Sequence, residues 1–194
     1  IIAVRSIVPE LKSALTDAGA FEVKGRAAER LTATVIEEQR GSGQSSSLRR
    51  DLIGRDAEVI MREAGLSCPE GVRLVFFEAE SEHPLVWTGQ MMPVMPLVTV
   101  GSAEDAIDLA KRVERGCGHT AVMHSRNIDN LSRMARVMDV SIFVKNGPSF
   151  AGLSFGGEGF TSFTIASPTG EGLTRASTFT RERRCTLVDY FRII

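Results

Sequence analysis

The sequence predicts an α/β fold with three layers, αβα, around a largely parallel sheet. Short runs of β-branched and aromatic residues alternate along the chain with segments of helical period. Strands that are joined through helices pair in parallel, and a parallel sheet needs helices on both faces. The 194 residues suffice for a well-buried core, and 43% hydrophobic with 24% charged residues is typical of a globular protein.

The first half of the chain begins with an apolar strand, Ile1–Val4, followed by a helix from about Ile7 to Ala18. A second helix is expected over Arg26–Gln39, where apolar residues recur at helical period. The stretch Gly41–Ser47 is of low complexity and predicts a flexible surface loop. A phosphate-binding loop is the alternative, but the Gly-Lys-Ser/Thr ending of such loops is missing. A third helix is expected over Asp56–Ala64.

Two strands of β-branched and aromatic residues follow, Val72–Ala79 and Met92–Val100. Pro93 and Pro96 cannot donate to a ladder, so the second strand is expected to start late or to lie at a sheet edge. Between the two strands, His83 precedes a proline, and we interpret it as a turn residue.

The clearest helix starts at Ser102, whose spacing to Asp105 resembles a capping box, and it runs to about Arg115. A strand over His119–His124, a helix after Asn127 and a strand over Val140–Val144 continue the alternation.

The stretch Val140–Gly172 then carries many Gly, Ser, Thr and Phe residues and almost no charge. It predicts either the lining of a ligand cleft, with glycines that allow close approach and phenylalanines that form an apolar wall, or a loop that closes the core over a sheet edge.

The end of the chain differs from the rest. A short helix is expected from Glu171 to about Thr180, and Arg181, Arg183 and Arg184 lead into the run CTLVDYFRII. This run predicts a strand with apolar side chains on both faces, and such a strand needs a partner. We therefore expect a domain over residues 1–180 and an oligomerisation strand over 181–194, through which the chain pairs with a second copy of itself.

Charge and cysteine content bear on partners and compartment. A net charge of −1 predicts neither a nucleic-acid nor a membrane partner. Because no apolar run approaches the length that spans a bilayer and no secretion signal begins the chain, we expect a cytoplasmic protein. Cys68, Cys117 and Cys185 have unrelated spacings, which indicates reduced thiols and neither a disulfide framework nor a metal site.

Four long motifs occur in a fixed order: MMPVMPLV, HTAVMHSRNID, FVKNGPSFAGLSFGGEGFTSFTIASPTGEG and RRCTLVD. They resemble, in the same order, the coenzyme A-acylating aldehyde dehydrogenases, which include the propionaldehyde and acetaldehyde dehydrogenases of bacterial microcompartments. The resemblance implies the catalytic domain of an aldehyde dehydrogenase. It also implies NAD-dependent oxidation of a short-chain, propionaldehyde-like aldehyde, with coenzyme A as co-substrate and acyl-CoA as product.

The resemblance assigns cofactor binding to Gly89, Gln90, Met91 and Pro93, within TGQMMPV. The family carries a glutamate at the position of Gly89, where it holds the nicotinamide ribose, and a side chain against the nicotinamide end at the position of Met91. Gly89 has no side chain to accept a ribose hydroxyl. Three interpretations stay open: weakened cofactor binding, substitution by the amide of Gln90, or an altered residue.

Two groups of residues match the family's aldehyde side: the NGPS turn and the Phe-Gly-Gly of the pocket. They are Asn146, Pro148, Ser149, Phe155, Gly156 and Gly157. For the glycines, chain reversal is the structural alternative.

The family's nucleophilic cysteine matches none of the cysteines in this chain and is expected upstream of Ile1, so the isolated chain is expected to be inactive. Cys117, two residues before His119, is the local alternative, because an imidazole lowers the pKa of a nearby thiol.

The arginine run admits contact with coenzyme A phosphates or a solvated basic cluster. In the family the C-terminal strand pairs with another subunit, and an N-terminal peptide targets the protein to the microcompartment shell. Whether this protein is encapsulated stays open. The alternatives to the acylating enzyme are a non-acylating aldehyde dehydrogenase domain, in which water replaces coenzyme A, and a non-catalytic assembly or binding module.

Overall fold

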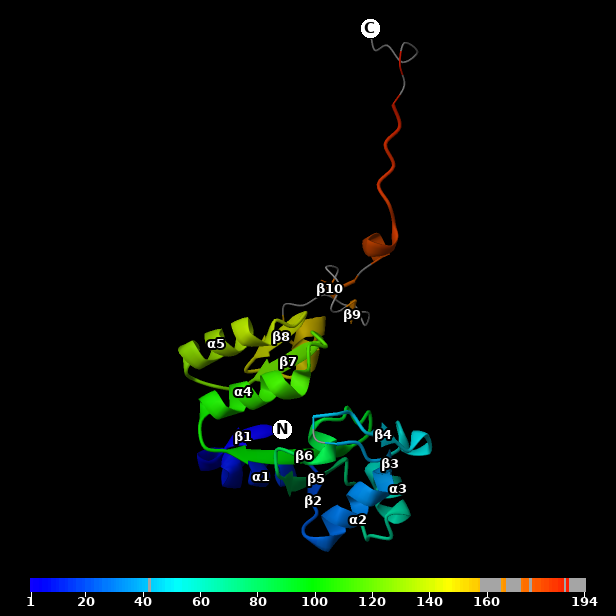
Figure 1. Ribbon diagram of the computed structural model, residues 1–194, viewed down its shortest axis with the longest axis vertical. Helices are drawn as coiled ribbons and strands as arrows, with labels where there is room; N and C mark the ends of the chain where they lie inside the picture. The colour runs from blue at the N-terminus through cyan, green and yellow to red at the C-terminus, as the bar shows by residue number, and fades with distance from the viewer. Residues whose placement is uncertain (42, 158–164, 167–171, 175, 187, 189–194) are drawn as a thin grey trace. The chain divides into compact units, whose positions relative to one another are not determined.

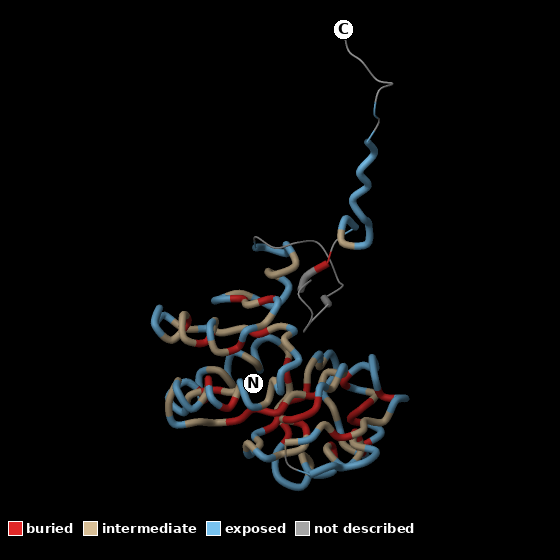
Figure 2. The backbone as a smooth tube through the Cα atoms, turned by 45° about the horizontal axis from the view of Figure 1, so that its top comes forward, coloured by how far each residue is buried: buried red, intermediate tan, exposed pale blue. Residues whose placement is uncertain are grey.

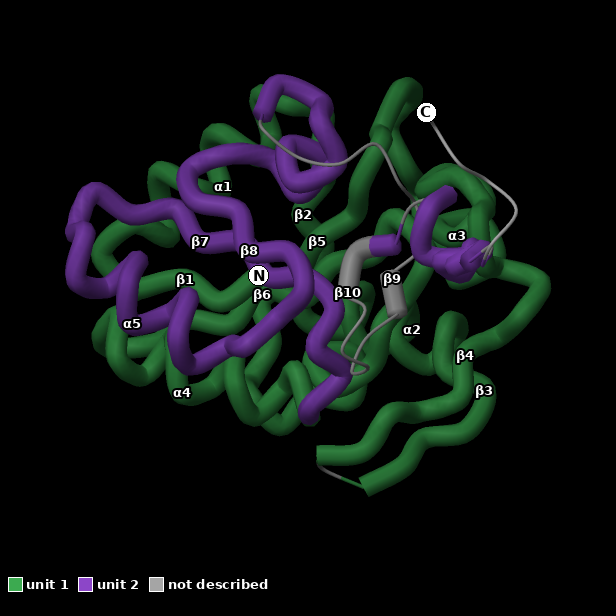
Figure 3. Tube along the Cα trace, turned by 90° about the horizontal axis from the view of Figure 1, so that it is seen from above, with its two compact units in different colours: residues 1–115 green, residues 116–194 purple. Residues whose placement is uncertain are grey.

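The computed structural model describes residues 1–41, 43–157, 165–166, 172–174, 176–186 and 188. The chain forms two compact units, residues 1–115 and residues 116–194 (Figure 3). Each unit is described by itself below. The predicted division into residues 1–180 and 181–194 stays a prediction.

Unit 1 is built on a four-stranded parallel sheet, which confirms the α/β prediction (Figure 1). The order of the strands across the sheet is β1-β6-β5-β2. Their bounds are β1 Ile2–Val4, β2 Ala20–Glu22, β5 Leu74–Ala79 and β6 Val94–Val100. The register pairs Ile2 with Val98, Val75 with Val94, and Ala20 with Leu74.

Four α-helices and three 3₁₀ turns accompany this sheet. The α-helices are α1 Val8–Asp17, α2 Arg26–Val35, α3 Ala57–Glu63 and α4 Ala103–Glu114, and the turns are η1 Arg5–Ile7, η2 Arg50–Leu52 and η3 Pro84–Val86. None of the helices that the structure describes combines the length and the apolarity needed to cross a bilayer.

Helices cover both faces of the sheet in unit 1. Val75 and Phe77 of β5 belong to the main apolar cluster, which also contains buried residues of α2 and α3. Leu97 of β6 pairs with Glu78 and so lies on the opposite face, where it packs with Val8 of α1. Figure 2 shows the buried residues of both faces in red.

The second helix ends four residues earlier than predicted. The backbone of Ile36 is extended (φ −92°, ψ 122°), and β3, Ile36–Glu38, pairs antiparallel with β4, Ser47–Leu48. The low-complexity segment is therefore the connection of a hairpin, and the prediction of a flexible loop is wrong at its end. Ser46 is 7% exposed, and its amide donates to Thr88 Oγ1 at 3.0 Å.

The two prolines delay β6 but do not move it to an edge. β6 starts at Val94, as the late-start alternative predicted, and lies between β1 and β5. The carbonyl of Pro96 accepts at 2.8 Å from the amino group of Ile1, the residue just before β1. On the other side, the β5 ladder uses the carbonyl of Pro93, which accepts from Val75 N at 2.9 Å. The interior strand β6 thus tolerates Pro96. The N–H that Pro96 lacks would face β1 just before the first residue pair of the β1–β6 ladder, where no partner strand residue needs it.

The predicted start of α4 at Ser102 is confirmed, with the Ser102 hydroxyl, in place of the backbone N–H of a capping box, donating to Asp105. Ser102 Oγ accepts from the amide of Asp105 at 3.1 Å and donates to the carboxylate of the same residue at 2.8 Å. The helix ends at Arg115, which adopts the left-handed conformation with φ 55°.

Unit 2 begins with a βαβ arrangement. β7, Thr120–Met123, and β8, Ile142–Lys145, pair in parallel, and α5, Ile128–Met138, connects them. The helix follows Asn127 as predicted, and Asn127 caps it, because its Oδ1 accepts from Asp129 N at 2.9 Å and from Asn130 N at 3.1 Å. The 3₁₀ turn η4, Ser149–Leu153, follows β8.

The helix that was predicted over Glu171–Thr180 is wrong in the part that is described. Gly172–Leu173 form β10, which pairs antiparallel with β9, Ile165–Ala166, and only Ala176–Phe179 are helical, as the 3₁₀ turn η5. The predicted oligomerisation strand lies largely outside the described residues. Cys185, Thr186 and Val188 are described and form no regular element.

Candidate functional site

The predicted cofactor residues form a loop that ends where β6 begins. Gly54 N donates to Met91 O at 3.1 Å, and Val94 N donates to Met92 O at 2.8 Å, so the part of the loop next to β6 is held by two backbone bonds. Met91 has a positive φ of 48° and its side chain is 72% exposed. An exposed apolar side chain in a strained backbone conformation costs free energy, and this makes Met91 a candidate for contact with a ligand.

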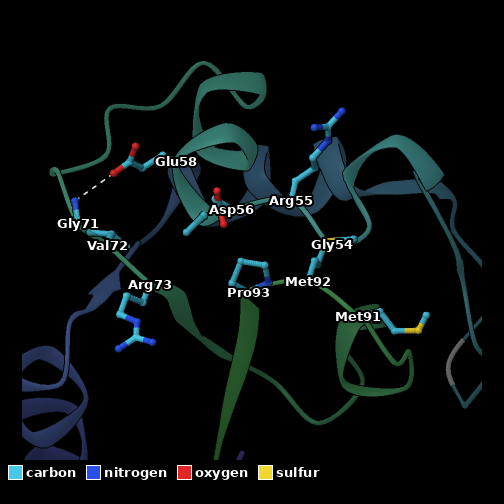
Figure 4. A pocket seen from close by; sticks show the side chains of 11 residues that line it. Gly54, Arg55, Asp56, Glu58, Gly71, Val72, Arg73, Met91, Met92 and Pro93 are labelled. Carbon is cyan, nitrogen blue, oxygen red and sulfur yellow. Dashed lines mark hydrogen bonds between the residues drawn. The ribbon is translucent and has the colours of Figure 1, made fainter.

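Three chain segments meet around this loop and line a hollow of about 510 Å³ (Figure 4). Met91–Pro93 form one wall, Gly54–Glu58 before and within α3 form the second, and Gly71–Arg73 before β5 form the third. Glu58 fastens the third wall to the second, because its Oε1 accepts from Gly71 N at 3.0 Å. The register of β5 with β6 explains the approach, since it sets Val75 beside Val94.

Arg55 and Arg73 are among the residues that line this hollow, and their guanidinium groups point away from each other (Figure 4). Both side chains are exposed. Guanidinium groups bind phosphate through paired hydrogen bonds, but Arg55 Nε donates to Asp51 O at 3.3 Å. Asp56 and Glu58 in the same hollow balance these charges. Sequence reasoning missed both arginines, because only the pairing of distant strands brings them to the loop.

The structure leaves room for a side chain at Gly89. Its φ is not positive, and an added Cβ would meet no atom within 4 Å. The backbone therefore does not require glycine here. Gln90 is partly committed to the loop itself, because its Nε2 donates to the carbonyl of Leu85. Its role as a substitute for the missing carboxylate stays a prediction.

In unit 2, the NGPS turn follows β8 directly. Asn146 has a positive φ of 55°, and its side chain makes two hydrogen bonds with the backbone of Ser125. Oδ1 accepts from Ser125 N at 2.8 Å, and Nδ2 donates to Ser125 O at 2.9 Å. Pro148 precedes the first residue of η4, Ser149, and its carbonyl accepts from Ala151 N at 2.9 Å.

Two aromatic rings close this turn. Phe150 and Phe155 meet edge to face with centroids 6.1 Å apart, and Phe155 N donates to Phe150 O at 3.1 Å. Their side chains are 59% and 58% exposed. Phe155 was a predicted site residue and Phe150 was not, although both belong to the same Gly- and Phe-rich stretch.

The glycines of this turn are required by its geometry. An added Cβ on Gly152 would lie 2.3 Å from Ile142 Cγ2, and one on Gly157 would lie 2.7 Å from the carbonyl oxygen of Ala151. Gly156 has a φ of +74°. The chain-reversal interpretation thus holds for Gly156 and Gly157, and it is compatible with a place beside the aldehyde.

The described cysteines and histidines offer no assembled nucleophile. Burial, with a smaller contribution from Glu58, raises the pKa of the Cys68 thiol, which disfavours the thiolate. Cys117 and Cys185 are exposed. His83 serves the fold, as predicted for a turn residue, because its Nδ1 accepts from Leu85 N at 3.2 Å and its ring contacts Phe77 at 5.2 Å.

Two further predictions from the sequence concern the arginine run and metal binding. Arg181, Arg183 and Arg184 are exposed in a segment without regular structure. Within the described ranges, no group of three or more histidine, cysteine or carboxylate side chains is placed to hold a metal ion.

No family model matches the chain. Solved structures nevertheless superpose on it closely. Propionaldehyde dehydrogenase of Rhodopseudomonas palustris with bound propionyl-CoA matches 96% of the chain, with a TM-score of 0.85 and 41% identity. Propionaldehyde dehydrogenase from the fucose-utilisation microcompartment of Clostridium phytofermentans matches the same share, with a TM-score of 0.86 and 40% identity. The parallel sheet, the loop before β6 and the turn after β8 therefore define part of an aldehyde dehydrogenase-like protein.

The curated relatives narrow this class. The acetylating acetaldehyde dehydrogenase EutE of Salmonella typhimurium is 49% identical over 196 aligned positions, which cover the whole chain. The CoA-propanoylating propanal dehydrogenase of Citrobacter freundii is 40% identical, again over the whole chain. The resemblance predicted from the motifs is confirmed: the chain corresponds to a segment of the coenzyme A-acylating acetaldehyde and propionaldehyde dehydrogenases. It spans 41% of the length of each of these two relatives.

Proposed function

We propose that the chain serves an NAD-dependent, coenzyme A-acylating aldehyde dehydrogenase. The reaction converts a short-chain, propionaldehyde-like aldehyde, coenzyme A and NAD⁺ to acyl-CoA, NADH and a proton. The observation that carries this proposal is 49% identity to an acetylating acetaldehyde dehydrogenase across every part of the chain. Structural relatives that contain propionyl-CoA, or CoA with an acylated cysteine, support the choice of co-substrate. An engineered glycolyl-CoA reductase with bound NADP⁺ supports a nicotinamide cofactor.

The two candidate sites take different parts of this reaction. The loop with Gly89, Gln90, Met91 and Pro93 lies beside a hollow that two arginines line, which supports cofactor binding there. The turn that begins at Asn146 presents exposed phenylalanine rings, which support contact with the apolar part of an aldehyde. When bound, NAD⁺ accepts the hydride, and the residues of this chain contribute binding and orientation.

The 194 residues alone are proposed to be inactive. Thioester formation needs a thiolate beside the aldehyde carbon. In this chain Cys68 is disfavoured as a thiolate, and neither Cys117 nor Cys185 belongs to the loop or the turn described above. The purified chain should therefore form no NADH with propionaldehyde, NAD⁺ and coenzyme A. Turnover that Cys117→Ala abolishes would contradict this.

A chimera tests the proposal itself. In the acetaldehyde dehydrogenase EutE of Salmonella typhimurium, the present chain would replace the segment that it matches. We expect NADH formation that depends on both acetaldehyde and coenzyme A, followed by absorbance at 340 nm. A folded chimera without activity would contradict the proposal, and activity that is independent of coenzyme A would favour the non-acylating alternative.

Location and partners are proposed from the same relatives. A place in the cytoplasm, inside a bacterial microcompartment, is supported by the microcompartment origin of a solved relative. Self-association through residues 181–194 and contact with a shell through an N-terminal peptide are further parts of the proposal.

A further inference from the structure

One side chain ties the turn after β8 to the chain after β7. The Asn146 side-chain amide pairs with the peptide groups of Ser125 as one peptide pairs with another in a sheet: its Oδ1 accepts one bond at 2.8 Å and its Nδ2 donates one at 2.9 Å. The Asn146 amide nitrogen of the backbone adds a third bond, to Met123 O at 2.9 Å. Three hydrogen bonds thus start from one residue at the root of the turn.

Few residue types can satisfy this position. A φ of 55° favours glycine, asparagine and aspartate. Glycine lacks a side chain, and an aspartate carboxylate would accept from Ser125 N but could not donate to Ser125 O. Asparagine alone among these three supplies both the backbone conformation and the two complementary groups.

The contacts on either side of Asn146 are rigid. Ser125 Oγ accepts from Asn127 N at 3.1 Å, and Asn127 caps α5, so one end of the link is fixed to a helix terminus. On the other side the chain continues at once into η4, where Gly152 packs closely against Ile142 of β8. The Asn146 amide therefore joins the βαβ frame to the segment that carries the two phenylalanines.

We infer that Asn146 is a positioning residue. Its amide fixes the segment with Phe150 and Phe155 for the aldehyde through the two bonds to Ser125, and we assign it this positioning role in place of a contact with the aldehyde. This inference rests on the proposed function in one respect only, that the turn faces the aldehyde. It replaces the direct substrate contact that the sequence assigned to Asn146.

Amide hydrogen exchange of the 194-residue chain, followed by nuclear magnetic resonance, tests the positioning. In Asn146→Gly, which keeps the positive φ, we expect exchange at Ser125 and Phe155 to accelerate by roughly tenfold or more, and the contact between the two rings to weaken. Asn146→Asp keeps the acceptor and should protect Ser125 better than the glycine variant does. Asp139→Gly is the matched control, because Asp139 also has a positive φ in unit 2 and ends α5.

Two results of this experiment would overturn the inference. One is unchanged exchange at Ser125 in Asn146→Gly, which would mean that the bonds do not hold. The other is faster exchange at Ser125 with Phe155 and the ring contact unaltered, which would separate the link from the turn. If the glycine variant does not fold, exchange at Ser125 and Phe155 is compared between Asn146→Asp, which loses the donor to Ser125 O, and the unaltered chain. Unchanged exchange at either amide in Asn146→Asp would then overturn the inference.

The chimera supplies the kinetic test. There Asn146→Gly should raise the KM for acetaldehyde roughly tenfold to a hundredfold, the usual cost of a misplaced binding group, and should leave the KM for NAD⁺ near its original value. A raised aldehyde KM with unaltered protection of Phe155 would mean direct contact with the aldehyde and would overturn the inference. An inactive unaltered chimera would count against the proposed function, while the exchange data would still decide the role of Asn146.

Discussion

Replacing Gly152 by alanine should destabilise unit 2, because the new methyl group would overlap β8. An ideal Cβ at this position lies 2.3 Å from Ile142 Cγ2 and 3.3 Å from Val144 Cγ2. Both side chains are buried, with exposed fractions of 6% and 7%. Ile142 Cγ2 is attached directly to the branched Cβ, whose χ1 is restricted and whose surroundings are packed, so the methyl group has little room to move aside. Either η4 or β8 must shift.

The size of the effect follows from two opposing contributions. Overpacking a well-packed contact costs about 1–3 kcal/mol. Alanine loses less backbone entropy on folding than glycine does, which offsets about 0.4–1 kcal/mol. We therefore expect a net loss of about 1–2 kcal/mol, and each 1 kcal/mol lowers the melting temperature of a unit of this size by about 4–8 °C.

Urea denaturation followed by far-ultraviolet circular dichroism measures this loss. Gly89→Ala is the matched control, because a Cβ there meets no atom within 4 Å and the φ is not positive. The control should be stabilised by about 0.4–1 kcal/mol. Fluorescence of Trp87, which is buried in unit 1, distinguishes a loss confined to unit 2 from a general one. Equal stability of Gly152→Ala and the unaltered chain would refute the reasoning.

Three further predictions concern the cofactor, pH and assembly. In the chimera, Gly89→Glu should tighten NAD⁺ binding by about 1.5–3 kcal/mol through a charge-assisted bond to the ribose, and Gly89→Gln by less; unchanged affinities by calorimetry would place Gly89 away from the ribose. Burial lowers the pKa of His83 in the folded chain. As pH falls below about 6.5, His83 therefore takes up a proton in the unfolded chain before it does so in the folded chain, and the free energy of unfolding should decrease until the pH reaches the lowered pKa. His83→Asn, which keeps a capping acceptor without titrating, should flatten the stability profile between about pH 7 and pH 5, and an identical slope in both proteins would remove His83 as the cause. Deleting Thr186–Ile194 should lower the sedimentation-derived oligomeric state, and equal association of the truncated chain would move the predicted strand into its own sheet.

The elements that the sequence predicted well are those decided by local chemistry. The Ser102 cap and the start of a helix after Asn127 depend on side chains within a few residues of one another. Of the four strands of the sheet, β1, β5 and β6 were predicted, whereas β2, Ala20–Glu22, was missed because three residues are too short to show a strand pattern. The β3–β4 hairpin was missed for a different reason. The helical period continues past Val35, and the extended conformation of Ile36 is supported by pairing with Leu48, twelve residues away.

The hollow beside the loop with Gly89, Gln90, Met91 and Pro93 also depends on contacts between residues that are far apart in the sequence. Met91 was assigned from its motif, but Arg55 and Arg73 lie in segments that carry no motif of their own. Their approach depends on the register of β5 with β6, which a single sequence does not specify at the level of individual residues. Pro96 is a related case, since the rule against interior prolines applies only where a neighbouring strand needs the missing donor.

The turn after β8 shows why a motif match locates a site better than it assigns roles within it. Asn146 is occupied by Ser125, and Gly152 and Gly157 are needed because no Cβ fits. These three residues determine the shape of the turn, so their presence in the motif is explained before any ligand is considered. Phe150 and Phe155 are different, because both rings remain more than half exposed although the fold offers burial elsewhere. Under the proposed function we therefore expect aldehyde selectivity to depend on these phenylalanines, with the asparagine and glycines holding them in place.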